Sequence, residues 1–234
     1  MSLKDLQFSL KKSSNIEQAK ALQKYFKTGP GEYGEGDIFL GIKVPALRSI
    51  ARQHPDLTFD ELRELIISPV HEERMAALMI LVKRFPGSEP EEKEKIYKFY
   101  LQNSKNINNW DLVDLSAPQI VGGYLIDRNK RILEKLADSK NLWEKRISIL
   151  ATFRFIKGNQ FDTAFIIAEK LLNDKNDLIH KAVGWMLREI GKRDLTAEEE
   201  FLKDRFKKMP RTMLRYAIEK FPENKRKAYL QGKI

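Results

Sequence analysis

The chain has no cysteine and only three histidines among its 234 residues. Disulfides and thiolate metal sites are therefore excluded, and His54, His71 and His180 lack the close spacing of a histidine metal pair. No apolar run approaches the length of a membrane span, and residues 1–12 are too charged for a signal peptide. We expect a folded cytoplasmic protein that uses no metal or other cofactor and binds no membrane.

Strand patterns are missing as well. No segment alternates β-branched and polar residues between Asn-Gly or Asp-Gly turns, and most segments place apolar residues at helical spacing. Asn109 is a suitable N-cap, and Pro90 suits a first helical turn. Capping boxes predict three further helix starts, at Thr58–Glu61, Ser88–Glu91 and Thr196–Glu199. The sequence predicts an all-α protein.

A regular rhythm runs through the predicted helices. Four of them begin with a basic residue and continue into an apolar face, namely Arg74, Arg146, Lys181 and Arg215. The successive intervals are 72, 35 and 34 residues, and the midpoint of the first is position 110. This period predicts a solenoid of helical hairpins in which equivalent helices line one concave surface. The four basic residues would then form a row on that surface.

The positive charge is concentrated near the end of the sequence. The net charge is +10, and residues 201–234 contain 11 Lys and Arg against three acids. Either a solvated basic tail or a surface for nucleic-acid phosphates explains this concentration.

The helix expected to begin at Trp110 carries an unusual group of side chains. Trp110 and Asp114 are four residues apart, and Asp111 and Asp114 are three apart, so all three can share one side of the helix. The helix dipole favours an ionised Asp114. Pro118 interrupts or kinks the helix, and the Gly-Gly pair at 122–123 allows close approach beyond it.

Purely structural explanations of these residues remain open. Asp114 could form a purely structural ion pair with Arg146 of the next repeat, because such pairs can resemble functional sites. Trp110, Trp143 and Trp185 could be core residues.

Two other features do not decide between a structural and a functional role. Arg146 and Arg154 stand in an otherwise apolar helix, where a buried guanidinium needs a carboxylate or a phosphate. The Gly-rich segment 28–37 lacks the Gly-Lys-Ser/Thr of a phosphate-binding loop, so we expect a flexible connection there.

Taken together, several segments resemble the AlkD family of bacterial DNA alkylation repair glycosylases, which are built from HEAT-like helical repeats. The resemblance implies one domain over residues 1–234, folded as a right-handed solenoid of HEAT-like helical hairpins with a concave basic surface. The segments that carry it are 39–45, 110–114 with 117–118 and 121–122, 143–150, and 181–189.

The resemblance also assigns roles to particular residues. Asp114 matches the family's catalytic aspartate, and Trp110 and Trp185 match two tryptophans that flank the sugar of the damaged nucleotide. Arg146 matches an arginine that holds the DNA backbone, and Tyr25 approximately matches a tyrosine at the DNA surface. The other residues expected at the DNA interface are Lys43, Arg74, Trp143, Arg154, Lys181, Arg188 and Arg215.

The function implied is metal-independent base excision repair. Such an enzyme hydrolyses the N-glycosidic bond of N3- or N7-alkylated purines, for example 3-methyladenine or 7-methylguanine, and leaves an abasic site. The expected partner is double-stranded DNA, bound by a monomer. The alternatives are a non-catalytic helical-repeat protein that binds damaged or branched DNA, and a protein-interaction scaffold.

Overall fold

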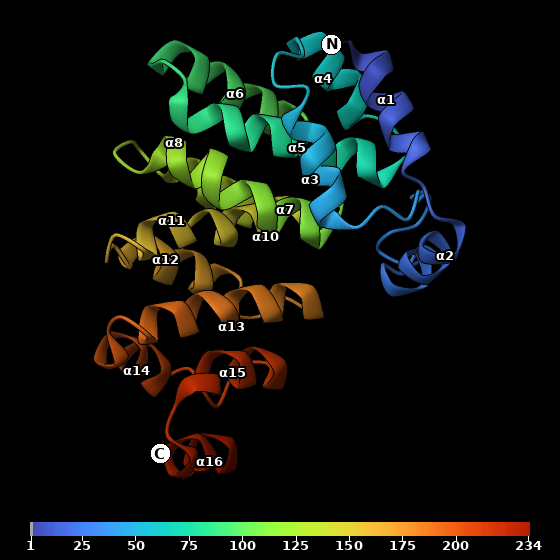
Figure 1. Ribbon diagram of the computed structural model, residues 1–234. Helices are drawn as coiled ribbons and strands as arrows, with labels where there is room; N and C mark the ends of the chain where they lie inside the picture. Colours follow the sequence, from blue (N-terminus) through green and yellow to red (C-terminus); the bar gives the residue numbers. More distant parts are fainter. Residues whose placement is uncertain (1) are drawn as a thin grey trace. The chain divides into compact units, whose positions relative to one another are not determined.

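The protein is described here as a computed structural model, in which residues 2–234 are placed (Figure 1). Within these residues every regular element is a helix, apart from an isolated bridge between Ile38 and Val70. The all-α prediction is confirmed. None of the described helices is long and apolar enough to cross a membrane. The chain divides into two compact units, one ending at Ser116 and the other beginning at Ala117.

The first unit is organised around one buried helix. Its elements are α1 (Leu3–Lys12), α2 (Ile16–Tyr25), α3 (Val44–Arg52), α4 (Phe59–Ile66), α5 (His71–Arg84), η1 (Phe85–Gly87), α6 (Pro90–Gln102), η2 (Ser104–Asn106) and most of α7 (Trp110–Ala117). Residues 71–81 of α5 are all buried, and both α3 and α4 pack against this helix (Figure 1). The run from Met75 to Leu81 is apolar on every side, which is typical of a helix enclosed by others.

The second unit is a stack of helical hairpins. Its elements are η3 (Pro118–Gly122), α8 (Gly123–Leu125), α9 (Arg131–Ala137), α10 (Leu142–Ala151), α11 (Phe153–Ile156), α12 (Asp162–Lys170), α13 (Asp177–Gly191), α14 (Leu195–Lys203), α15 (Arg211–Ala217), η4 (Ile218–Lys220) and α16 (Glu223–Gln231). Helices α9 and α12 pack against α10 and α13, respectively, while α10, α13 and α15 follow one another in a row (Figure 1). The predicted solenoid class is confirmed by this repeat-like packing.

The sequence rhythm corresponds to equivalent helix positions. Arg146, Lys181 and Arg215 are each the fifth residue of their helix, as Asp114 is of α7, whereas Arg74 is the fourth residue of α5. The period of about 35 residues therefore marks successive repeats of one hairpin unit.

Two glycines let helices of the second unit touch backbone to backbone. A Cβ atom on Gly122 would lie 2.3 Å from the carbonyl oxygen of Ala151. On Gly184 it would lie 2.4 Å from the carbonyl oxygen of Met213. The close approach predicted for the Gly-Gly pair is confirmed at Gly122, which ends the π-helical turn η3 that Pro118 begins.

Helix starts were only partly predictable from capping patterns. The capping box of Thr58 and Glu61 is confirmed at the start of α4. The other two boxes are wrong. Helix α6 begins at Pro90 without a side-chain cap. Asp194 rather than Thr196 caps α14, because Asp194 has the extended backbone of an N-cap and accepts the N–H of residue 197.

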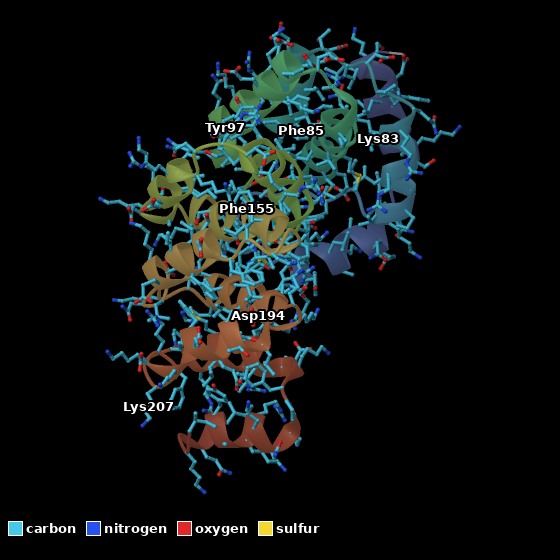
Figure 2. The ribbon with its side chains drawn as sticks, turned by 90° about the vertical axis from the view of Figure 1, so that its left-hand side faces the viewer. Lys83, Phe85, Tyr97, Phe155, Asp194 and Lys207 are labelled. Atoms are coloured by element: carbon cyan, nitrogen blue, oxygen red, sulfur yellow. The ribbon has the colours of Figure 1, made fainter. Side chains whose placement is uncertain are left out.

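The basic end of the sequence is folded. It contributes the end of α14 and all of α15 and α16, and Phe206, Phe221 and Tyr229 pack together in its interior. Lys207 lies on the outside, whereas Phe155 belongs to the core of the same unit (Figure 2). The explanation by a solvated tail is wrong, because apolar side chains fix this segment.

Candidate active site on helix α7

Helix α7 begins where the sequence predicts. The side-chain oxygen of Asn109 accepts the N–H of Trp110 at 2.8 Å, and its carbonyl oxygen accepts the N–H of Val113. Leu112 and Val113 are fully buried and anchor the helix in the first unit. Trp110 and Asp114 remain partly exposed, one helical turn apart. Both side chains are therefore partly accessible to a ligand.

The second acid of the helix has a different environment. The Asp111 carboxylate lies 2.9 Å from Nε2 of His71 and is only 18% exposed. Asp111 is thus engaged inside the protein, although its spacing allowed it to share a side with Asp114. Asp114, one turn further along the helix, is likewise partly exposed.

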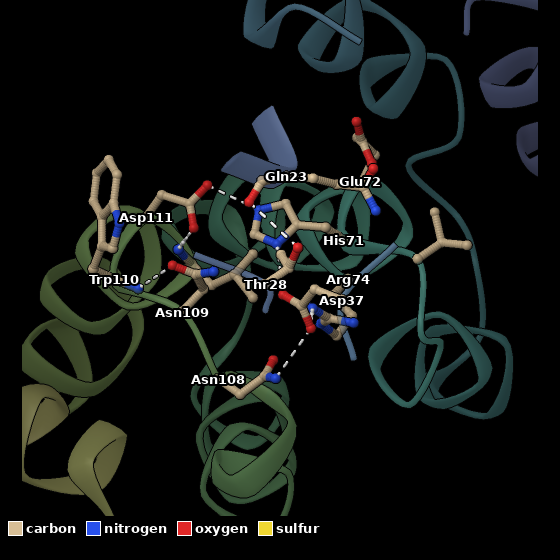
Figure 3. Close-up of polar contacts among 12 residues, drawn as sticks. Gln23, Thr28, Asp37, His71, Glu72, Arg74, Asn108, Asn109, Trp110 and Asp111 are labelled. Carbon is tan, nitrogen blue, oxygen red and sulfur yellow. Dashed lines mark hydrogen bonds and ion pairs between the residues drawn. The ribbon is translucent and has the colours of Figure 1, made fainter. Parts of the chain in front are cut away.

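A buried chain of charges lies beneath the start of α7 (Figure 3). Nδ1 of His71 is 3.3 Å from the Asp37 carboxylate, and the Arg74 guanidinium is 2.7 Å from the other oxygen of Asp37. Asn108 donates a further hydrogen bond to Asp37 at 3.3 Å. With Asp111, these contacts form a continuous polar network across the first unit.

The network shifts the titration of its members. Burial of Asp37 favours its neutral form, but the hydrogen bond with His71 and the charge of Arg74 outweigh burial and hold the Asp37 pKa below its usual range. Burial of His71 likewise opposes its charge. Its hydrogen bonds with Asp111 and Asp37 outweigh that effect and raise the His71 pKa.

Aromatic rings connect the network to the indole. The Phe39 ring stacks on His71 with centroids 4.4 Å apart. Phe26 lies against His71 at 5.3 Å and stacks on Trp110 at 5.2 Å, and Tyr25 meets Trp110 edge-on at 6.1 Å. Trp110 is therefore held from one side by packed rings.

The segment after the Gly-rich loop is fixed by one carboxylate. Glu72, which is buried, accepts the backbone N–H groups of Leu40, Gly41 and Ile42 at 2.8 to 3.2 Å. Gly41 has φ +80°, a conformation that favours glycine. This anchor brings Phe39 and Asp37 to α5.

Two residues predicted at the DNA interface are buried in the structure. Arg74 is 3% exposed, paired with Asp37 and bonded to the carbonyl of Ser68, so it does not belong to an exposed basic row. Trp143 is 6% exposed.

Arg146 is also buried, at 5% exposure, and its guanidinium donates to the carbonyl of Leu178 at 2.6 Å. The exposed members of the predicted interface are Tyr25, Lys43, Arg154 and Arg215. Lys181 pairs with Asp177, and Arg188 pairs with Glu219. Trp185 is partly exposed in α13.

Sequence reasoning missed a basic rim in the first unit. Arg48, Arg52 and Lys83 surround a hollow of about 1080 Å³ with an apolar lining that includes Ile80 and Leu115. Within residues 2–234, no hydrogen bond or ion pair engages these three cations. The four-residue spacing of Arg48 and Arg52 was the available signal. His71 and Asp37 were missed too, because neither belongs to a local motif.

Fold and site together define an all-α helical-repeat protein with a partly exposed Trp-Asp pair on a basic chain. The chain belongs to the DNA alkylation repair enzyme family, whose model matches residues 6–221. This membership indicates a role in DNA repair.

One solved structure, described as a predicted DNA alkylation repair enzyme from Enterococcus faecalis, is similar in fold. Its TM-score is 0.69 at 17% sequence identity, over 90% of this chain and 98% of that one. At this identity the similarity concerns the fold alone. A comparison with curated proteins finds no match.

Proposed function

We propose that the protein is a monofunctional DNA glycosylase that removes N3- and N7-alkylated purines from duplex DNA. The observation that carries the proposal is the pairing of Trp110 and Asp114 one turn apart at a partly exposed helix start. Family membership supplies the DNA substrate class.

The reaction requires little from the enzyme beyond stabilisation of the charge that develops on the sugar. An alkylated purine of this kind is already cationic, so the electron pair of the breaking C1′–N bond neutralises the departing base. The sugar becomes oxocarbenium-like, water adds at C1′, and a proton is released. Asp114 in its ionised form stabilises the sugar cation and orients the water.

Aromatic faces add to this stabilisation. A cation over an indole gains about 2 kcal/mol when water is excluded. Trp110 is positioned for such a contact by its packed underside. Trp185 of the second unit is the second tryptophan that the resemblance assigns to this role.

Binding to the duplex requires cations that are free to meet phosphates. Lys43, Arg154 and Arg215 are exposed, and the basic rim adds Arg48, Arg52 and Lys83. In this proposal they hold the DNA backbone, and affinity falls with salt as counterions are released.

The test is single-turnover release of 7-methylguanine from a defined duplex. We expect Asp114→Asn to slow release about 100-fold, the size of effect seen when one charge-stabilising group is removed from an active site. Asp127→Asn is the control, because Asp127 is an exposed aspartate in the turn that follows α8.

Equal rates for both variants and the parent would contradict the role of Asp114. Absence of release by the parent, with salt-dependent duplex binding, would favour the non-catalytic DNA-binding alternative.

A further inference from the structure

A buried histidine held between two carboxylates occurs directly beneath the candidate site. His71 is 3% exposed, and each of its ring nitrogens faces a different aspartate, Asp37 or Asp111 (Figure 3). His54 is also buried, but its Nδ1 has no hydrogen-bond partner. The two-sided arrangement is therefore not a general consequence of burying a histidine in this protein.

We propose that His71 is a positioning residue, which in its doubly protonated form bridges Asp37 to Asp111 and thereby fixes the first turn of α7 and the orientation of Trp110. This inference rests on the proposed function for its effect on base release. Its effect on Trp110 is independent of any activity.

The hydrogen-bond inventory of imidazole requires the charged form. A neutral ring has one N–H and one lone pair, so it can donate to only one of the two carboxylates. The other nitrogen would then direct its lone pair at a carboxylate oxygen. With distances of 2.9 Å to Asp111 and 3.3 Å to Asp37, only the imidazolium satisfies both acids.

The charges around the ring lead to the same conclusion. Arg74 pairs with Asp37, so the cluster of Arg74, Asp37, His71 and Asp111 is neutral only when His71 is charged. Loss of that proton leaves an excess carboxylate charge in a dry environment, which is costly. Glu72 faces backbone N–H groups of the preceding segment instead.

Tyr33 and Tyr25 are further titratable groups near Trp110. Burial raises the pKa of the Tyr33 hydroxyl above its ordinary value, so this group stays neutral where a histidine titrates.

Two physical links transmit the state of His71 to the indole. Asp111 is the residue next to Trp110, and its other carboxylate oxygen accepts the N–H of Leu112 at 2.8 Å, so movement of Asp111 displaces the helix start. Phe26 touches both the imidazole and the indole. Deprotonation of His71 would therefore release Trp110 from two sides.

The direction of the pH effect follows from these contacts. Although burial opposes the charge, the two carboxylates raise the His71 pKa. The bridge is present at low and neutral pH and is lost as pH rises through this elevated pKa. Trp110 order and base release should decline together on the alkaline side.

The experiment uses the full-length protein labelled with 5-fluorotryptophan. The Trp110 resonance is assigned by its loss in Trp110→Phe, and the His71 ring protons are assigned by their loss in His71→Gln. We expect the Trp110 fluorine shift and the His71 ring protons to titrate with one midpoint. We expect the shift to become independent of pH in His71→Gln and to remain in the matched control His54→Gln.

Kinetics then separate positioning from folding. Misplacing a catalytic group costs about 10- to 100-fold in rate, so His71→Gln should slow single-turnover release by that factor while affinity for undamaged duplex changes less than about twofold. Asp111→Asn, which retains the Asp37 contact, should lower the His71 midpoint.

The outcomes are distinguishable. The inference is overturned if, in the parent protein, the Trp110 resonance does not change as His71 titrates, or if His71 is uncharged at pH 6. Coupled titration without base release supports the positioning link and refutes the glycosylase.

Discussion

The buried carboxyl of Glu198 should make the free energy of unfolding decrease as pH rises. This side chain of α14 is 1% exposed, and its Oε1 has no hydrogen-bond partner in the described chain. Burial, helped by the charge of Glu199 and opposed by that of Arg188, raises the pKa of Glu198 to about 9. The carboxyl is therefore protonated in the folded protein at neutral pH and ionised in the unfolded chain.

The magnitude follows from proton linkage. Between the ordinary value of 4.5 and the folded value of about 9, the native state holds one proton more than the unfolded state. The free energy of unfolding then falls by up to about 1.4 kcal/mol per pH unit, or about 3 kcal/mol from pH 5.5 to 7.5. Glu198→Gln keeps the shape of the neutral acid and should lose this slope.

Urea unfolding of the parent and Glu198→Gln at pH 5.5, 6.5 and 7.5 provides the assay. The raised pKa of His71 contributes a slope of the same sign to both proteins, so their difference isolates Glu198. Glu200→Gln is the control, because Glu200 is exposed on the same helix. Parallel pH dependences for parent and Glu198→Gln would refute the reasoning.

Two further predictions concern the cations. Replacing Arg48, Arg52 and Lys83 together with alanine should reduce the slope of log affinity against log salt by up to about 2.7 for undamaged duplex, or about 0.9 per phosphate contact; an unchanged slope in a binding titration would exclude this rim from the interface. Arg74→Met should destabilise the protein by about 3 kcal/mol in urea unfolding, because it leaves Asp37 buried without its cation. Arg215→Met, at an exposed position, should weaken DNA binding with little change in stability. If Arg74→Met instead weakens DNA binding and leaves the stability unchanged, Arg74 belongs to the DNA surface.

Local signals predicted the repeat architecture and the start of α7. Asn109 and Trp110 are neighbours in sequence, and the spacing of Arg146, Lys181 and Arg215 reflects one hairpin per period, so both features can be found without tertiary information. The same reasoning from local sequence placed Arg74 wrongly on an exposed surface. Its basic side chain favoured an exposed row, but it lies at the buried start of α5 and pairs inward with Asp37.

The network under α7 was beyond sequence reasoning for a different reason. His71 lies 34 residues from Asp37 and 40 from Asp111, and no spacing rule connects them. Asp37 also sits in a Gly-rich loop whose path depends on the capture of backbone N–H groups by Glu72. Only the folded chain shows that Asp111, one of the two acids of α7, is held by a buried histidine.

The most direct test of the central claim measures rate and affinity on the same duplex containing a single 7-methylguanine. If Asp114 acts on the reacting sugar, Asp114→Asn should lower the single-turnover rate about 100-fold while the Kd for the duplex stays within about twofold or becomes tighter, since an acid near a polyanion is removed. A variant that releases the base at the parental rate, or that loses activity only through a weaker Kd, would contradict the account.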